Sequence, residues 1–243
     1  MDTNLTGKTA LITGAGKRIG YAIAMALAEE GVNLVLHYNR SAKEAEKLAK
    51  EIKSQKVNVW LIQSDFDKPD EVDSLIPRSM SLSGTLDILI NSASIFKNNT
   101  IENVDYQSLS QHIQVNAWTP FILSRDFANT VNSGKIINLL DTRIQSYDFN
   151  HVAYILSKNM LATLTRMMAI EFAPKITVNG IAPGLILPPP GQDQEYLDKL
   201  IDTVPLKKHG DPQDIAAAVV YLLKSDFITG QIINVDGGRH LRT

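Results

Sequence analysis

The sequence predicts a single-domain α/β fold, with a doubly wound sheet of seven parallel strands and helices on both of its faces. Seven short runs rich in apolar and β-branched residues alternate with longer segments of helix-spaced alanine, leucine and isoleucine. Each run is nearly all apolar rather than alternating, which is typical of strands that helices cover on both sides. The 243 residues contain no tract that resembles a linker, so we expect one unit over residues 1–243.

The expected strands are residues 8–13, 32–37, 57–63, 86–90, 135–140, 176–181 and 231–235. Helical patterns such as 19–30 and 42–53 lie between them, so successive strands are expected to be joined as βαβ units. One connection is different, because it contains the run Pro188-Pro189-Pro190-Gly191. Prolines stop a helix, so we expect a stiff surface loop here, within a substrate loop over residues 185–202.

Composition argues against several classes of partner. A formal net charge of -2 supplies no basic field for nucleic acid, and no run is apolar for long enough to cross a bilayer. Cysteine is absent, and the spacing of His112, His151 and His209 predicts no metal site. The N-terminal residues lack the basic and apolar regions of a signal peptide. We expect a cytoplasmic protein that binds no nucleic acid, membrane or metal.

A glycine-rich turn follows the first strand and precedes a helix, with the sequence Thr13-Gly14-Ala15-Gly16-Lys17-Arg18-Ile19-Gly20. Its glycines permit tight turning and a close backbone approach, and the N-terminus of the helix can hold a pyrophosphate. The strict G-x-G-x-x-G spacing is not met, because Ile19 stands where the third glycine would fall. A dinucleotide site is the prediction, and a plain glycine-rich turn is the alternative.

The end of the second strand indicates which dinucleotide is bound. An NAD site usually places Asp or Glu here for the ribose 2′-hydroxyl, but this chain has the run His37-Tyr38-Asn39-Arg40-Ser41. His37, Arg40 and Ser41, with Lys17 and Arg18, can neutralise and hydrogen-bond a 2′-phosphate. NADPH is therefore favoured, unless Arg40 merely begins a solvated helix. After the third strand, Asp65 and Phe66 are assigned to the same site, where Asp65 caps the adenine edge or simply begins a turn.

Tyr154 and Lys158 are the candidates for proton transfer. They are four residues apart in a helical stretch, so their side chains leave the same face. A nearby ammonium favours the phenolate and lowers a tyrosine pKa that starts near ~10. The phenol then becomes a usable acid or base close to neutral pH. A chance pair on an exposed helix face is the alternative.

In order and spacing, these residues resemble the short-chain dehydrogenase/reductase family over nearly the whole chain. The matching motifs are Thr13-Gly14 with Gly20, Asn91-Ser92-Ala93, Asn116, Tyr154-x-x-x-Lys158 and Pro183-Gly184. The resemblance implies a Rossmann fold, with Tyr154 as the catalytic acid, Lys158 on the nicotinamide ribose and Asn116 holding a proton-relay water. It also implies a cofactor lined by Asn91, Ser92, Ala93, Pro183, Gly184, Leu185 and Ile186. A homotetramer is implied too, and the apolar helical stretch 153–172 indicates a subunit interface.

Two departures from the common family pattern point to one branch. Arg18 replaces the middle glycine of the fingerprint, and Asp141 replaces the serine 13 residues before Tyr154. Both resemble the pteridine reductase and dihydromonapterin reductase branch. Further matches to that branch are His37-Tyr38-x-Arg40-Ser41, Ser94, Phe96 and the run Asp236 to Arg242.

Chemistry gives these exchanges a reason. A carboxylate repels the alkoxide that forms from a ketone, whereas a pterin offers N–H donors to Asp141 and needs a proton on a ring nitrogen. Arg18 is expected to contact the cofactor phosphate and the pterin oxygen. The resemblance to pteridine reductases implies that Phe96 sandwiches the heterocycle against the nicotinamide. Alternatively, Asp141 only caps a loop and Phe96 only packs in the core.

The lead hypothesis is transfer of hydride from NADPH to C6 of a dihydropterin, such as dihydromonapterin or dihydrobiopterin, with protonation at N5. The expected substrate site comprises Arg18, Ser94, Phe96, Asp141 and Tyr154. A second hypothesis is a carbonyl reductase for an acyl-carrier substrate or a small ketone, in which Thr142 or Ser146 replaces the missing serine. A third is a regulator that binds NADPH without turnover.

Overall fold

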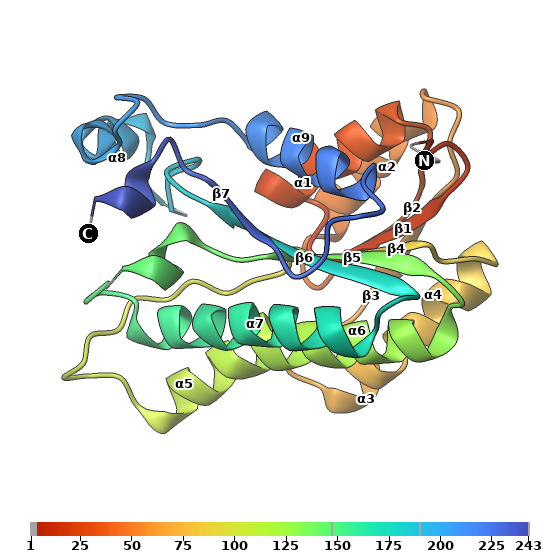
Figure 1. The fold of residues 1–243 in the computed structure, drawn as a ribbon, viewed down its shortest axis with the longest axis horizontal. Coiled ribbons are helices and arrows are strands. Elements are labelled where there is room, and N and C mark those ends of the chain that lie inside the picture. Colours follow the sequence, from red (N-terminus) through yellow and green to blue (C-terminus); the bar gives the residue numbers. More distant parts are fainter. Residues whose placement is uncertain (1–3, 147, 190, 243) are drawn as a thin grey trace.

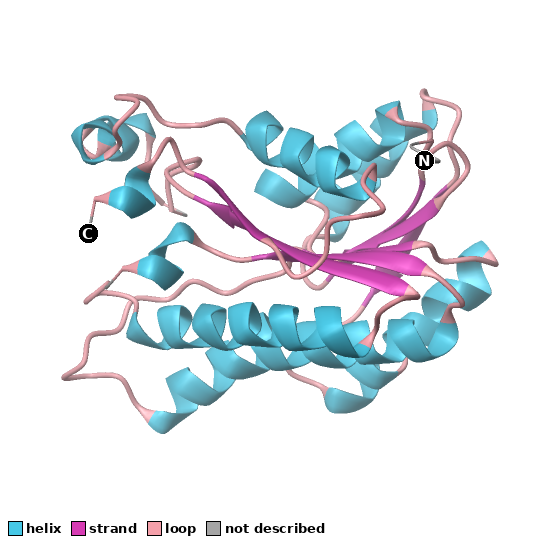
Figure 2. Cartoon of the chain, in the orientation of Figure 1, coloured by secondary structure: helices cyan, strands magenta, loops and turns pink. Residues whose placement is uncertain are grey.

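Seven parallel strands form one sheet in the computed structural model, which describes residues 4–146, 148–189 and 191–242. The strand order is β3-β2-β1-β4-β5-β6-β7, so the chain first builds outward on one side of β1 and then on the other. The strands are β1 (Thr9–Ile12), β2 (Asn33–Tyr38), β3 (Val59–Gln63), β4 (Ile88–Asn91), β5 (Gly134–Leu139), β6 (Ile176–Pro183) and β7 (Ile232–Val235). The prediction of a doubly wound, seven-stranded parallel sheet is confirmed (Figure 2). Pro190, in the expected proline-rich loop, lies outside the described residues.

Helices cover both faces of the sheet (Figure 1). On one face lie α1 (Arg18–Glu29), α2 (Ala42–Lys53) and α9 (Pro212–Leu223). On the other face lie α3 (Pro69–Asp73), α4 (Leu75–Ser83), α5 (Tyr106–Ile113), α6 (Thr119–Thr130) and α7 (Val152–Glu171). The short helices are the π-helical turn η1 (Gln114–Trp118), η2 (Thr142–Gln145), α8 (Gln194–Asp198), η3 (Ile201–Thr203) and η4 (Arg239–Leu241). Among the described helices, none is both long and apolar enough to cross a membrane.

The sheet separates two hydrophobic layers. In β1, Ala10 and Ile12 belong to the layer with α1 and α9, whereas Leu11 belongs to the layer with α6 and α7. Successive side chains of a strand point to opposite faces, so both sets are buried. Phe127 of α6 and Met168 of α7 fill the second layer. This two-sided burial is the reason why the strand sequences are apolar throughout.

Parallel register brings the carboxyl ends of the strands to one edge of the sheet. Ile12 of β1 pairs with Ile90 of β4, Leu139 of β5 with Ile181 of β6, and Pro183 with Val235 of β7. The strand order reverses at β1 and β4, which is where ligands of open α/β sheets usually bind. In Figure 1, α8 and the C-terminal segment lie beyond this same edge.

Candidate active site

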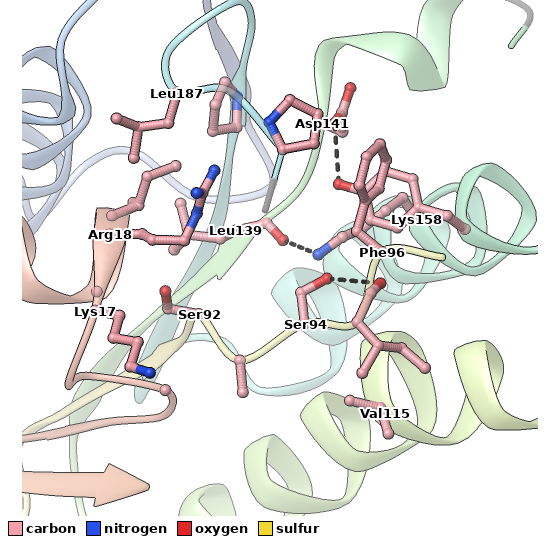
Figure 3. Close-up of a pocket in the computed structure, with 18 of the residues that line it drawn as sticks. Lys17, Arg18, Ser92, Ser94, Phe96, Val115, Leu139, Asp141, Lys158 and Leu187 are labelled. Atoms are coloured by element: carbon pink, nitrogen blue, oxygen red, sulfur yellow. Dashed lines mark hydrogen bonds between the residues drawn. The ribbon is translucent and has the colours of Figure 1, made fainter. Parts of the chain in front are cut away.

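A pocket of about 610 Å³ opens at the carboxyl edge of the sheet. Loops that follow β1, β2, β4, β5 and β6 contribute to its wall, together with the first turns of α7 (Figure 3). The predicted site residues that line it are Gly14, Lys17, Arg18, Ile19, Gly20, His37, Tyr38, Asn39, Arg40, Ser41, Asp65, Phe66, Ser92, Ala93, Ser94, Phe96, Asp141, Tyr154, Lys158, Pro183, Gly184, Leu185 and Ile186. Asn91 and Asn116 are the two predicted site residues that do not line it.

The turn between β1 and α1 leaves a helix N-terminus open. Lys17, at the N-cap, makes no capping bond with its side chain, so the first backbone N–H groups of α1 are free to bind an anion. Gly14 has φ 66°, and a Cβ there would lie 2.9 Å from Cα of Ala93. A Cβ on Gly20 would collide with the carbonyl oxygen of Gly14. Both glycines are thus needed for the close approach of β1, α1 and the loop after β4.

His37 holds this turn in place through a hydrogen bond with Gly14. The amide of Gly14 donates to its Nδ1 at 3.2 Å, so Nε2 carries the hydrogen and donates to the carbonyl oxygen of Ser64 at 3.0 Å. The ring stacks on Phe66 with 4.5 Å between the centroids. Burial lowers the pKa of His37 to about 4, so the imidazole is neutral at physiological pH. His37 therefore brings no positive charge to a 2′-phosphate, and its place at the cofactor stays a prediction.

Polar side chains surround the end of β2. Arg40 is exposed, and its guanidinium makes no hydrogen bond or ion pair with the described residues. Lys17 also lines the pocket, and its Nζ lies 2.6 Å from Glu44 Oε1, a half-exposed pair that contributes little to stability. Asn39 donates to Asp65 at 3.0 Å and orients that carboxylate. The region can accept an anion at Arg40 without first breaking a buried ion pair.

Asn91 has a structural role. It is buried, and its amide nitrogen donates to Asn138 Oδ1 at 2.8 Å and to Ser124 Oγ at 3.1 Å. These bonds tie β4 to β5 and α6, and Asn91, which was expected along the cofactor, does not line the pocket. Ser92 and Ala93 remain at the pocket because their amides donate to Thr13 Oγ1 at 2.9 and 3.0 Å.

Asn116 lies on the π-helical turn η1, a feature often found near functional sites. Its Oδ1 accepts the amide of Ile95 at 2.8 Å, and its Nδ2 donates to the carbonyl oxygen of Ile95 at 3.0 Å and to Ser157 Oγ at 3.1 Å. The side chain is fully buried. Asn116 therefore fixes the loop after β4 against α7, and the expected relay water at this residue stays a prediction.

Asp141 and Lys158 lie at the chemical end of the pocket (Figure 3), where Tyr154 also lines the wall. The hydroxyl of Tyr154 donates to Asp141 Oδ2 at 2.9 Å. Lys158 is buried and donates to the carbonyl oxygen of Leu139 at 2.7 Å, with its Nζ 5.7 Å from the centre of the Tyr154 ring. Asp141 is therefore the charged group in direct contact with the phenol.

This arrangement overturns the expected titration of Tyr154. Burial and the adjacent charge of Asp141 raise the pKa of Tyr154 well above 10, so the hydroxyl keeps its proton. Burial lowers the pKa of Lys158 to about 8. The prediction that Lys158 brings the pKa of Tyr154 close to neutrality is wrong, because the carboxylate lies closer to the phenol than the ammonium does. Tyr154 is held as a proton donor.

Asp141 also caps the short helix η2. Its Oδ1 accepts the amide of Arg143 at 2.8 Å while Oδ2 faces Tyr154. Capping and contact with the phenol are thus carried out by different oxygens of one carboxylate. The bond to Arg143 fixes the rotamer, so Oδ2 is directed into the pocket.

Phe96 forms part of the pocket wall (Figure 3) and contacts Tyr154. The imidazole of His151 stacks on it with 4.0 Å between the centroids, and Tyr154 meets it edge-on at 4.7 Å. Arg143 places its guanidinium carbon 5.5 Å from the centre of the Phe96 ring. Because His151 covers one face of Phe96, a planar ligand has at most the opposite face to stack against.

The lining residues that were not predicted as site residues include Arg143, Tyr196 and Arg239. These three come from η2, α8 and η4, and only the folded chain brings them to the same pocket. In the sequence, the one indication of a role for Arg239 was the resemblance of the run Asp236 to Arg242 to the pteridine reductase branch. No group of three or more His, Cys, Asp or Glu side chains suited to a metal ion occurs among the described residues.

Comparisons with known proteins agree with this geometry. A family model described as enoyl-(acyl carrier protein) reductase matches residues 14–240. The chain is 35% identical to the 3-oxoacyl-(acyl-carrier-protein) reductase FabG of Staphylococcus epidermidis, over 96% of this chain and 99% of the relative. It is 34% identical to the versicolorin reductase stcU of Emericella nidulans, over 96% of each chain.

Among solved structures, the FolM alternative dihydrofolate reductase 1 of Brucella canis, complexed with NADP, superposes with a TM-score of 0.93. It is 32% identical, and the match covers 98% of this chain and 96% of that one. The fingerprint turn, the tyrosine-lysine pair on α7 and these matches over nearly the whole length lead to one conclusion. The chain belongs to the short-chain dehydrogenase/reductase family of NAD(P)-dependent oxidoreductases.

Proposed function

We propose that this protein is an NADPH-dependent reductase that converts a dihydropterin into a tetrahydropterin. The observation that carries the proposal is the 2.9 Å hydrogen bond from Tyr154 to Asp141, a carboxylate where ketone reductases of the family have a serine. A carboxylate is a poor partner for a forming alkoxide but a good acceptor for the amino and ring N–H groups of a pterin. Asp141 therefore favours a nitrogen heterocycle over a ketone.

The cofactor end suits NADPH. The uncapped N-terminus of α1 and the close approach at Gly14 and Gly20 fit a pyrophosphate. Arg40, Ser41 and Lys17 can bind a 2′-phosphate, with His37 fixing the turn as a neutral ring. Bound NADPH supplies the hydride for C6 of the pterin. The NADP complex of the Brucella relative supports the same choice.

Protonation of N5 falls to Tyr154. Its raised pKa keeps the proton on the phenol until N5 gains electron density, and the proton then passes from Tyr154 to N5. The phenolate that results is stabilised by Lys158, which has a pKa of about 8 and is mostly charged at neutral pH. Asp141 accepts N–H bonds from the pterin and lies on the path by which Tyr154 regains a proton.

Arg18 supports the assignment through its backbone. It has φ 56°, a left-handed conformation that costs a non-glycine residue roughly 1–2 kcal/mol. Its guanidinium lines the pocket and donates to the carbonyl oxygen of Pro188, in the loop after β6, at 2.8 Å. A strained residue with its charge at a pocket indicates a functional requirement. Contact with the pterin oxygen and the cofactor phosphate meets that requirement.

Reduction of a ketone is the second candidate, and the 35% identity to a 3-oxoacyl reductase favours it. The hydroxyls expected to replace the missing serine are poorly placed for that reaction. Thr142 is buried and donates to Asp236 at 2.6 Å, and Ser146 does not line the pocket. A non-catalytic NADPH-binding regulator has no need for a buried Tyr154 directed at a carboxylate.

The test is a comparison of substrates on the purified protein. NADPH absorbance is followed with 7,8-dihydromonapterin, 7,8-dihydrobiopterin and a 3-oxoacyl thioester. We expect turnover of at least one dihydropterin and little reduction of the thioester. Turnover of the thioester alone would reject the pterin assignment and favour the second candidate.

We also propose that the protein forms a homotetramer in which α7 lies at an interface. Leu156, Met167 and Ile170 of this helix are 51%, 59% and 81% exposed. Exposed apolar side chains on one long helix are typical of subunit contacts. Light scattering on the eluting protein should give four times the 26.8 kDa mass of the chain, and a monomer would reject the proposal.

A further inference from the structure

Arg239 stands out among the lining residues that the proposed mechanism does not use. It lies on η4, just after β7, and its side chain is half-buried at the wall of the pocket. The guanidinium makes no hydrogen bond or ion pair with any described residue, although its backbone is fully engaged. Five N–H donors held at a pocket without a protein acceptor indicate that a ligand supplies one.

The surroundings of Arg239 place it at the substrate end of the pocket. Burial and repulsion by Arg143 lower its pKa, while the charge of Asp141 opposes this shift. Tyr196 and Asp148 are its other electrostatic neighbours. Each of these groups lies near the chemical end, and none belongs to the turn after β1 or the end of β2. Arg239 is therefore directed at the substrate rather than at the phosphates of the cofactor.

A buried carboxylate holds the backbone of Arg239 in place. Asp236 accepts the amides of Gly238 at 3.0 Å and His240 at 2.7 Å, and also the Nδ1 of His240 at 2.8 Å. Thr142, the neighbour of Asp141, donates to the same carboxylate at 2.6 Å. The segment that carries Arg239 is thus fixed to the loop that carries Asp141. Such preorganisation lowers the entropy cost of binding a charged group.

Arg143 and Arg239 differ in their ion pairs. Arg143 lies 2.7 Å from Asp148, which also accepts from His151 at 2.9 Å, so its charge is balanced within the protein. Asp141 accepts from Tyr154 and from the amide of Arg143, and it forms no ion pair with Arg239. Arg239 is left without a carboxylate of its own within ion-pair distance, among the residues that the structure describes.

The geometry points to Arg239 as the anchor for an anionic group, a carboxylate or a phosphate, on the side chain of the substrate. This inference rests on the proposed reduction of a pterin and specifies which pterins are preferred. A smaller cavity of about 350 Å³ shares Phe96, Pro189 and Tyr196 with the main pocket. Amide side chains, such as Asn98 and Gln192, line it. Arg239 lines the main pocket and not this cavity, so the anchored anion is expected within the main pocket.

Three dihydropterins and three variants test the anchor. The substrates are 7,8-dihydrofolate with a carboxylate tail, 7,8-dihydroneopterin monophosphate with a phosphate, and neutral 7,8-dihydromonapterin. The variants are Arg239→Gln, Arg239→Lys and the control Arg242→Gln. Arg242 is exposed on the same tail and donates to the carbonyl oxygen of Asp202, so this control removes an equal charge outside the pocket.

Arg239→Gln should raise KM about 10- to 100-fold for the anionic substrate that the site prefers, because a charge-assisted bond is lost. Its kcat should change little, and KM for dihydromonapterin should stay within about twofold. Arg239→Lys should recover part of the loss, and Arg242→Gln should behave like the parent. A preference for dihydrofolate or for the phosphate identifies the anion. Equal changes in KM for neutral and anionic substrates, or no change, would overturn the inference.

Binding separates the failure of the anchor from the failure of the proposed reaction. Calorimetry with folate and the NADP-loaded parent and Arg239→Gln proteins measures affinity without turnover. A parent that turns over no dihydropterin yet binds folate through Arg239 would reject the reaction and keep the anchor. Equal folate affinity in both proteins would reject the anchor, whatever the turnover.

Discussion

The two ends of the pocket are built in different ways. The cofactor end comes from short stretches of chain, 14–20 and 37–41, and depends on glycines, backbone amides and one open helix N-terminus. The chemical end gathers Phe96, Asp141, Tyr154 and Arg239 from segments far apart in the sequence. The first end presents a general dinucleotide site, whereas the second sets the chemistry through side-chain charge. Changes at the two ends should therefore have different consequences.

The largest effect is expected for Tyr154→Phe. Loss of the proton donor should lower kcat by about 10²- to 10⁴-fold, because N5 then has no positioned acid. NADPH affinity should stay close to that of the parent, since the cofactor end is unchanged. Stopped-flow absorbance gives the rate, and NADPH fluorescence gives the affinity. A kcat within tenfold of the parent would assign the proton to another group.

His37→Gln tests the cofactor end through stability. The unfolded imidazole binds a proton near pH 6.5, whereas the folded one binds it only near pH 4. Between these pH values the unfolded state binds more protons. The contribution of neutral His37 to the free energy of unfolding is therefore fully present above pH 6.5 and is lost as the pH falls towards 4. The loss should reach about 3 kcal/mol at the acid end.

Glutamine can accept from Gly14 and donate to Ser64 but does not titrate, so the variant should lack this acid-dependent loss. Urea unfolding at pH 7 and pH 4.5 measures the difference between the two proteins. The same pH dependence in both would show that His37 is not buried as a neutral ring. Activity at pH 7 should change less than in Tyr154→Phe, because His37 contacts no reacting atom.

Arg18→Gly should give the smallest effect. It should make the protein more stable but weaken the binding of the substrate. Glycine removes the cost of φ 56° at this position, so the free energy of unfolding should rise by up to about 1 kcal/mol. KM for a dihydropterin should rise because the guanidinium is lost. Chemical unfolding and steady-state kinetics on the same sample check both. A less stable variant would mean that the bond from Arg18 to Pro188 outweighs the backbone strain.

The contrast between the two ends also explains what the sequence predicts well. Strand runs and helix spacing predict the sheet, because burial on both faces imposes an apolar pattern on every strand. The fingerprint turn is local in sequence, and its predicted site residues, Gly14 and 17–20, line the pocket as expected. Charge states are different, since they depend on burial and on neighbours from other segments.

Two predictions failed for that reason. Lys158 is close to Tyr154 along the helix, yet burial and the carboxylate of Asp141, from the loop after β5, raise the pKa of the hydroxyl. His37 was expected to help neutralise a 2′-phosphate, but it is buried against Ser64 and Phe66 and stays neutral. Arg239 could not be assigned from spacing, because only Asp236 and η4 bring it to the pocket.

Exchange of Asp141 for serine tests the central claim most directly. The measurement is the ratio of kcat/KM for a dihydropterin to kcat/KM for a 3-oxoacyl thioester, in the parent and in Asp141→Ser. We predict that the parent favours the pterin and that the substitution lowers its kcat/KM about 10- to 100-fold while thioester reduction rises. A parent that favours the thioester, with a ratio unchanged by Asp141→Ser, would contradict the assignment of a pterin substrate.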